Sequence, residues 1–313
     1  MFPTPILFLV FNRPETTRRV FEVIRQREPA YLFIAADGPR AGNEADDADC
    51  RQVKEVVSRI DWPCDVKYLY RAQNLGCKLA VSSAITWFFE HVEEGIILED
   101  DCLPDPGFFD FCQTLLEYYR ENPAVMHISG DNFQFGKQRG AASYYFSSLV
   151  HVWGWASWRR AWHSYDVNMS DWPRFKNSDR FGDLFGHRET VIQYWKHILD
   201  KVYEGKIDTW DYQWQYHVWN QGGFAVIPNV NLVSNIGFGS QATHTRDMNC
   251  FAALPVGSIP RIKHPPAIHP DRSADDFFFR GLGLLPGRKE KIQDFIKRGK
   301  YKLMRMMKRT PVI

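Results

Sequence analysis

The first part of the chain alternates short β-branched and aromatic runs with segments of helical periodicity. We predict strands at residues 5–12, 31–37, 65–71 and 95–98. We predict helices after Pro14, at 53–60 and at 79–91, with the acidic segment 44–49 as a loop or a helix start. Repeated strand–helix units of this kind are typical of an α/β fold with a mixed, mostly parallel sheet flanked by helices.

The pattern changes after the fourth strand. We expect a helix at 108–121, strands at 125–129 and 144–150, Trp-rich helices from Trp153 to Gln221, and an extended segment at 224–236. Residues 237–287 are rich in Gly, Pro and His, which favours loops lying over a site. We therefore divide the chain into a first half (1–135), a second half in the same compact unit (136–287), and a tail (288–313).

The charge is unevenly distributed along the chain. The 313 residues carry a net charge of +2, which offers no field for binding a nucleic acid. The tail from Arg288 contains ten basic and two acidic residues, and its apolar residues can share one helical face. Such a segment either contacts an anionic membrane peripherally or docks as an ordinary terminal helix.

The six cysteines and the N-terminal segment indicate a cytoplasmic protein. The cysteines form no Cys-x-x-Cys pair, so we expect reduced thiols. Residues 1–5 lack the features of a secretory signal. Residues 140–158 carry no charged side chain, but they are too polar for a membrane span.

Three consecutive acids, Glu99, Asp100 and Asp101, follow the apolar run 96–98. Open α/β sheets bind ligands at the carboxyl ends of their strands, so this position favours a site. Neighbouring carboxylates repel one another unless a cation neutralises them, and carboxylate oxygens are ligands that Mg²⁺ and Mn²⁺ prefer. The alternative is a solvated acidic turn that ends the strand.

Two further segments come after predicted strands. Asp37 precedes Gly38-Pro39, where it either stabilises a turn by accepting local N–H groups or accepts a hydrogen bond from a nucleobase. Arg71, Asn74, Gly76 and Lys78 stand directly before a helix, where backbone N–H groups and two cations can bind an anion. Asn74 and Gly76 are equally suited to a helix cap. The P-loop and dinucleotide-binding motifs are missing from the sequence.

Together these features resemble the GT-A-fold glycosyltransferases that use nucleotide sugars. The resemblance rests on Phe11-Asn12-Arg13-Pro14, Asp37, Arg71 with Asn74-x-Gly76, and Glu99-Asp100-Asp101 as a D-x-D-type motif. With Gly154-Trp155 and Trp210-Asp211-x-x-Trp214, the chain is similar to N-acetylglucosaminyltransferase I and its bacterial relatives. The resemblance covers residues 5 to about 245. It implies that residues 1–135 bind the nucleotide sugar and that residues 136–287 bind the acceptor and carry out catalysis.

The resemblance implies roles for individual residues. Asp101 would bind Mn²⁺ or Mg²⁺, and Glu99 and Asp100 would contact the ribose or the donor sugar. Residues implied to contact the donor are Phe11, Asn12, Arg13, Asp37, Arg71, Asn74, Gly76, Lys78 and Trp155. Asp211 would be the general base, although Tyr212-Gln213 departs from the family's second acid, so Asp208 remains a rival.

Two aromatic positions keep alternative interpretations. Trp155 belongs to a group of tryptophans that suits either core packing or stacking on a sugar. His244 lies on a glycine-bearing loop, where it either ligates the metal and diphosphate or is a solvated loop residue.

We therefore predict a metal-dependent, inverting glycosyltransferase that moves a sugar from a UDP-type donor to a saccharide or lipid-linked acceptor. The alternatives are a sugar-phosphate nucleotidyltransferase and a non-catalytic saccharide-binding protein. The first alternative lacks a Gly-rich loop after the first strand to accept a triphosphate.

Overall fold

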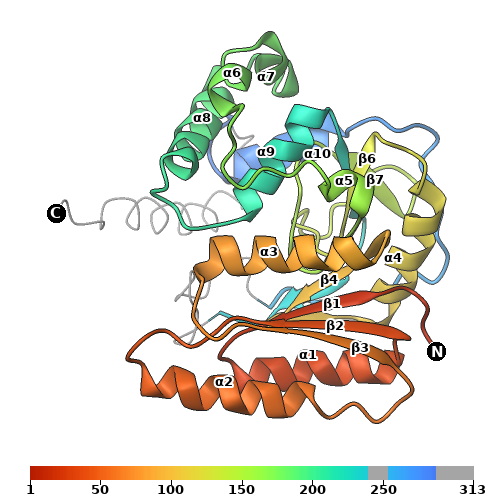
Figure 1. The fold of residues 1–313 in the computed structure, drawn as a ribbon. Coiled ribbons are helices and arrows are strands. Elements are labelled where there is room, and N and C mark those ends of the chain that lie inside the picture. The colour runs from red at the N-terminus through yellow and green to blue at the C-terminus, as the bar shows by residue number, and fades with distance from the viewer. Residues whose placement is uncertain (239–252, 287–313) are drawn as a thin grey trace.

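A computed structural model describes residues 1–238 and 253–286 (Figure 1). Its main feature is an eight-stranded mixed sheet with the strand order β3-β2-β1-β4-β8-β6-β9-β7. The strands of this sheet are β1 (Ile6–Val10), β2 (Tyr31–Ala36), β3 (Asp65–Tyr70), β4 (Glu94–Glu99), β6 (Val125–Ser129), β7 (Tyr144–Ser147), β8 (Trp155–Trp158) and β9 (Phe224–Pro228). A second, two-stranded sheet pairs β5 (Cys102–Pro104) with β10 (Val233–Asn235). The predicted α/β class with a mostly parallel sheet is confirmed.

The first four strands of the main sheet are parallel and are connected by helices on both faces. Helices α1 (Pro14–Arg27) and α2 (Glu44–Val57) cover one face, and α3 (Gly76–His91) covers the other (Figure 1). Strand β1 is buried along its whole length because its side chains alternate between two cores. Ile6 and Phe8 belong to the core beneath α1 and α2, whereas Leu7 and Leu9 belong to the core beneath α3. Burial on both faces explains the continuous apolar run in the sequence.

The chain changes direction across the sheet at β1. Strands β2 and β3 lie on one side of β1, and β4 lies on the other. The carboxyl ends of β1 and β4 thus lie at the point where the strand order reverses, which is where open α/β sheets bind their ligands. The register pairs Leu9 with Glu99, so the ends of the two strands lie at the same level.

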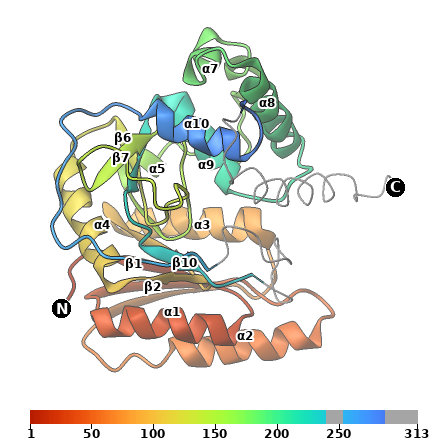
Figure 2. The same ribbon diagram turned by 180° about the vertical axis from the view of Figure 1, so that it is seen from behind.

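The second half of the chain extends the same sheet and adds a helical region. The remaining helices are α4 (Pro106–Tyr119), α5 (Arg159–Trp162), α6 (Trp172–Phe175), α7 (Asp179–Leu184), α8 (Glu189–Tyr203), α9 (Asp211–Gln221) and α10 (Arg272–Gly281). Helices α6, α7 and α8 lie at the opposite end of the molecule from α1 and α2 (Figures 1 and 2). The expected boundary at residues 135/136 falls between β6 and β7, which are strands of one sheet.

The structure corrects several expected elements. Residues Trp155–Trp158, expected in a helical region, form strand β8 because they pair with both β4 and β6. Part of the segment expected as loops forms helix α10, which begins where Asp271 accepts hydrogen bonds from two backbone N–H groups. The acidic segment from Glu44 is the first turn of α2, where its charges are favourable.

The length and polarity of the helices decide whether one of them could span a membrane. In the two described parts of the chain, every helix is too short or too polar to cross a bilayer.

Candidate functional site

The three consecutive acids lie at the carboxyl end of β4, beside the residues that follow β1. The backbone N–H of Phe11 donates to Oδ2 of Asp100 at 3.2 Å. The guanidinium of Arg13 donates to Oδ2 of Asp101 at 2.7 Å and lies 3.5 Å from Oδ1 of Asp100. The parallel pairing of β1 with β4 thus brings Arg13 and the acids together across 88 residues of sequence.

Arg13 is the cation that contacts this group of acids in the described part of the chain, and the group has little contact with water. The side chains of Arg13, Asp100 and Asp101 are 16%, 10% and 14% exposed. Burial raises the pKa of Glu99 well above its usual value, and the charges of Asp101 and Asp100 raise it further. Burial also raises the pKa of Asp100, against the opposing effect of Arg13. The acids therefore lie where an additional positive charge would stabilise their ionised forms.

Asp211 and Asp208 approach the same group from the second half of the chain. Burial raises the pKa of Cys77 above its usual value, and the charges of Glu99, Asp211 and Asp208 add to this effect. Cys77 belongs to the first turn of α3, so three elements converge there: the end of β4, the start of α3 and the start of α9. The charges of Asp211 and Asp208 thus both act on the start of α3, and the charge of Asp211 also acts on Glu99 at the end of β4.

The two candidate bases differ in their surroundings. Oδ1 of Asp211 accepts hydrogen bonds from the hydroxyl of Thr209 and, at 2.9 Å, from the backbone N–H of Tyr212. Its Oδ2 accepts no hydrogen bond from the described residues, so this oxygen can accept a proton. Asp208 is exposed, and its Oδ2 lies 2.9 Å from where a Cβ on Gly76 would be.

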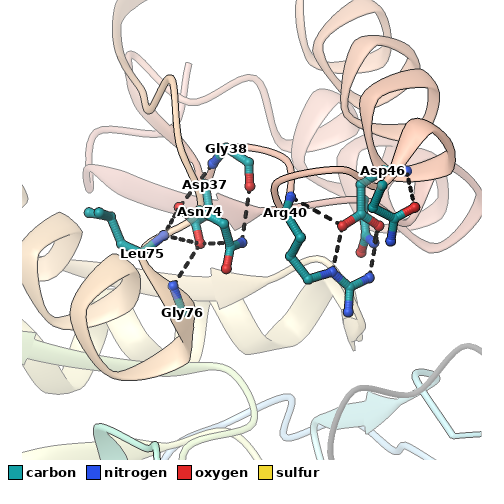
Figure 3. A network of polar contacts seen from close by, with 9 residues as sticks. Asp37, Gly38, Arg40, Asp46, Asn74, Leu75 and Gly76 are labelled. Atoms are coloured by element: carbon teal, nitrogen blue, oxygen red, sulfur yellow. Dashed lines mark hydrogen bonds and ion pairs between the residues drawn. The ribbon is translucent and has the colours of Figure 1, made fainter.

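The carboxylate of Asp37 accepts hydrogen bonds from neighbouring groups of the protein (Figure 3). It accepts hydrogen bonds from the backbone N–H groups of Gly38, Leu75 and Gly76 and from the side-chain amide of Asn74. This is the turn role that the sequence left open for Asp37, extended to the segment before α3. The same bonds occupy donors that were expected to bind an anion.

Figure 3 also shows the carboxylate of Asp46, which, like that of Asp37, accepts several hydrogen bonds from within the protein. Asp46 accepts from the side-chain amide of Asn12 at 2.8 Å and from the guanidinium of Arg40. Hydrogen bonds from Arg40 and Asn12 outweigh its burial and lower the pKa of Asp46 to about 2. Asn12, expected at the donor, thus holds the segment after β1 against α2.

The other expected donor-binding residues occupy the rim of this region. Arg71 donates to the hydroxyl of Ser83 at 3.0 Å. The ring of Phe11 is half-buried and lies 5.7 Å from the guanidinium of Arg40. Lys78 is half-buried in the first turn of α3.

Trp155 is in the core. Its side chain is 0% exposed and stacks on Trp210 and His127, with ring centroids 5.6 and 4.9 Å apart. Because neither face of the indole is open, we place Trp155 with the packing alternative and not against a sugar.

A buried pair, Asp131 and His151, escaped the sequence analysis. Asp131 is 1% exposed, and its carboxylate oxygens accept no hydrogen bond of good geometry from the described residues, although the backbone N–H groups of Asp131 itself and of Trp153 lie close enough to act against the effect of burial on its pKa. Its Oδ2 lies 3.8 Å from Nδ1 of His151. Asp131 comes shortly after the carboxyl end of β6, and Glu99 is the last residue of β4. Both strands are antiparallel to β8, which lies between them, so they run in the same direction. In the sequence, the signal that could have identified Asp131 is an acid shortly after an apolar run.

The acid group suits a hard cation in its chemistry. Its donors are carboxylate oxygens, and it carries an excess of negative charge. Within residues 1–238 and 253–286, no three potential ligand side chains converge on one point. A divalent cation would therefore be held by Asp101 together with oxygens of a bound substrate, an arrangement that Mg²⁺ commonly adopts. His244 and the basic tail lie outside the described residues.

Comparison with known proteins gives weak likenesses only. No family model matches the sequence, and neither does any curated protein. Among solved structures, the galactosyltransferase LgtC with donor and acceptor sugar analogues is 13% identical, with 95% of this chain and 99% of that one covered and a TM-score of 0.36. Mouse xyloside xylosyltransferase 1 is 11% identical, with 68% and 80% covered and a TM-score of 0.31. UDP-glucose pyrophosphorylase with UDP-glucose is 11% identical, with 46% and 62% covered and a TM-score of 0.27. These proteins are transferases, but TM-scores this low do not establish a common fold.

Proposed function

We propose that the chain is a GT-A-type glycosyltransferase that moves a sugar from a nucleoside-diphosphate donor, of UDP type, to a saccharide or lipid-linked acceptor. The observation that carries the proposal is that Glu99, Asp100 and Asp101 lie beside Arg13 at the sheet edge formed by the carboxyl ends of β1 and β4, with Asp211 close enough for its charge to raise the pKa of Glu99. That edge is where open α/β sheets bind nucleotides.

Each part of this group has a chemical task in the proposal. Asp101 holds Mn²⁺ or Mg²⁺, which when bound neutralises charge on the departing diphosphate. Arg13 supplies a positive charge beside the diphosphate. Glu99 and Asp100 contact the ribose or the donor sugar as hydrogen-bond partners.

Asp211 is the proposed general base of an inverting reaction. Its Oδ1 is fixed by Thr209 and Tyr212, so Oδ2 has a defined position from which to take the acceptor hydroxyl's proton. A positioned base typically contributes about 10²- to 10⁴-fold in rate. Asp208 is the rival for this role because its Oδ2 lies beside Gly76, the first residue of α3.

Calorimetry with UDP tests the binding part of the proposal. We expect UDP to bind in the presence of Mn²⁺ and to bind at least tenfold more weakly without it or in Asp101→Asn. Asp61→Asn is the matched control, since Asp61 is an exposed acid that pairs with Arg25 at the far end of α1. Equal UDP affinity with and without Mn²⁺ would contradict the proposal and favour a non-catalytic protein.

Turnover measurements test the base. Hydrolysis of UDP-sugars should fall at least a hundredfold in Asp211→Asn while UDP affinity stays within threefold. If Asp208→Asn loses turnover and Asp211→Asn does not, the base is Asp208.

The nucleotidyltransferase alternative is tested with UTP and a sugar 1-phosphate. The segment after β1 is Phe11-Asn12-Arg13, in which the side chains of Asn12 and Arg13 are bonded to acids and no glycine-rich cradle is present. We therefore expect no pyrophosphate release.

A cytoplasmic location, with peripheral contact of the tail at the inner face of the membrane, remains part of the proposal.

A further inference from the structure

We propose that Arg13 is a built-in counter-ion that competes with the divalent cation for Asp101, so that the cation binds firmly only together with the donor diphosphate. This inference rests on the proposed function. It assigns Arg13 a task that differs from contact with the nucleoside.

The competition follows from the oxygen that Arg13 uses. Oδ2 of Asp101 accepts the guanidinium hydrogen bond at 2.7 Å, whereas Oδ1 accepts a weak contact from the thiol of Cys102 at 3.5 Å. A Cβ on Gly237 would lie 2.1 Å from Oδ2, so the backbone of residue 237 packs directly against the carboxylate. The backbone N–H of Ile236 also bonds to the carbonyl of Asp101 at 2.8 Å. Asp101 is thus held in place, and a cation at Oδ2 must displace Arg13.

Arg13 itself is anchored at its backbone while its side chain spans the acids. Its carbonyl accepts hydrogen bonds from the N–H and the hydroxyl of Thr17, because residue 13 precedes the first turn of α1. Burial acts to lower the pKa of Arg13, but the charges of Asp100 and Asp101 outweigh it and keep the group protonated. A fixed backbone and a permanent charge suit a guanidinium that moves between two anionic partners.

The second partner is the diphosphate of the donor. A diphosphate brings oxygen ligands for the cation and accepts hydrogen bonds from arginine. When donor and cation arrive together, the guanidinium can exchange Asp101 for the diphosphate, and the positive charge near the acids is not lost. Donor and cation therefore bind cooperatively, and this coupling is reciprocal.

Mn²⁺ binding to the full chain, followed by electron paramagnetic resonance with and without UDP, tests the inference. The native protein should bind Mn²⁺ alone weakly, and UDP should increase its affinity. Arg13→Gln should bind Mn²⁺ alone at least tenfold more tightly, and UDP should increase that affinity at least tenfold less than in the native protein. Arg13→Lys keeps the charge and should stay within threefold of the native protein for Mn²⁺ alone.

Two control variants separate this effect from general changes. Arg25→Gln removes an exposed ion pair on the same helix and should leave Mn²⁺ affinity unchanged. Adding Asp101→Asn to Arg13→Gln should abolish the gain, because the gain depends on that carboxylate.

The outcomes distinguish this inference from the proposed function. If UDP and Mn²⁺ bind together in the native protein but Arg13→Gln binds Mn²⁺ alone no better, the counter-ion role is wrong and the proposed function stands. If none of the variants binds Mn²⁺ with or without UDP, both are wrong. Tighter Mn²⁺ binding in Arg13→Gln supports the competition, provided that the double variant loses it.

Discussion

Replacing Asp131 by asparagine should stabilise this protein, which is unusual for a change at a fully buried polar residue. Asp131 is 1% exposed, and its oxygens accept no well-formed hydrogen bond from the described residues, since the nearby backbone N–H groups of Asp131 and Trp153 only partly oppose the effect of burial. His151 offers it no positive charge at neutral pH, because burial lowers the pKa of that histidine to about 4. Asparagine has nearly the same size and carries no charge, so it removes the cost of a buried carboxylate without leaving a cavity.

The expected gain at pH 7.5 is about 1.4 kcal/mol in the free energy of unfolding for each unit by which burial raises the pKa of Asp131 in the folded state. Burial raises the pKa of Asp131 well above its ordinary value. The folded state therefore binds this proton more tightly than the unfolded state, and native stability decreases as the pH rises above about 4. The Asn variant lacks this contribution, so its advantage should be small near pH 4 and grow towards pH 7.5.

Urea unfolding at several pH values measures this difference, with Asp275→Asn as a matched control. Asp275 is also buried, but it accepts hydrogen bonds from Ser147 and Ser148. An amide there places N–H groups against N–H and O–H donors, so Asp275→Asn should lose about 1–3 kcal/mol.

Two results would refute this reasoning. A destabilised Asp131→Asn would show that the carboxylate has a strong partner in solution. A gain that is the same at pH 4 and pH 7.5 would show that ionisation of Asp131 is not its source.

Two further predictions concern the segment before α3. Gly76→Ala and Gly42→Ala should each lose about 1–2 kcal/mol of stability, because both glycines have a φ near +75°. A Cβ at residue 76 would also meet Oδ2 of Asp208, but that exposed side chain can move aside, so the two losses in urea unfolding should agree within about 0.5 kcal/mol. A much larger loss at residue 76 would show that Asp208 is fixed against it. Asp37→Ala should lose about 2 kcal/mol of stability, since it leaves the N–H groups of Leu75 and Gly76 without their acceptor. Asp61→Ala, at an exposed acid, should change the stability little. Faster amide hydrogen exchange at the start of α3 in Asp37→Ala alone would support the assignment, and unchanged exchange would contradict it.

Local chemistry in the sequence predicted much of the first half of the fold. The run 96–98 is continuously apolar because β4 is covered on both faces, and Pro14 begins α1 as its position after Asn12-Arg13 suggested. The run of tryptophans from Trp153 was misleading, because the helical spacing of large residues did not reveal that Trp155–Trp158 pairs with strands on both sides. Pairing between distant strands overrides local propensity.

For the candidate site, the sequence supplied the residue types and the strand ends. It determined that three carboxylates follow an apolar run, and it left open whether Asp37 serves a turn or a ligand. Only the tertiary structure decided that the oxygens of Asp37 are occupied by the segment before α3, that Trp155 lies in the core, and that Arg13 reaches Asp101. The reason is physical: a motif states which groups can bind, but burial and partners brought from distant parts of the chain decide which of their atoms remain available.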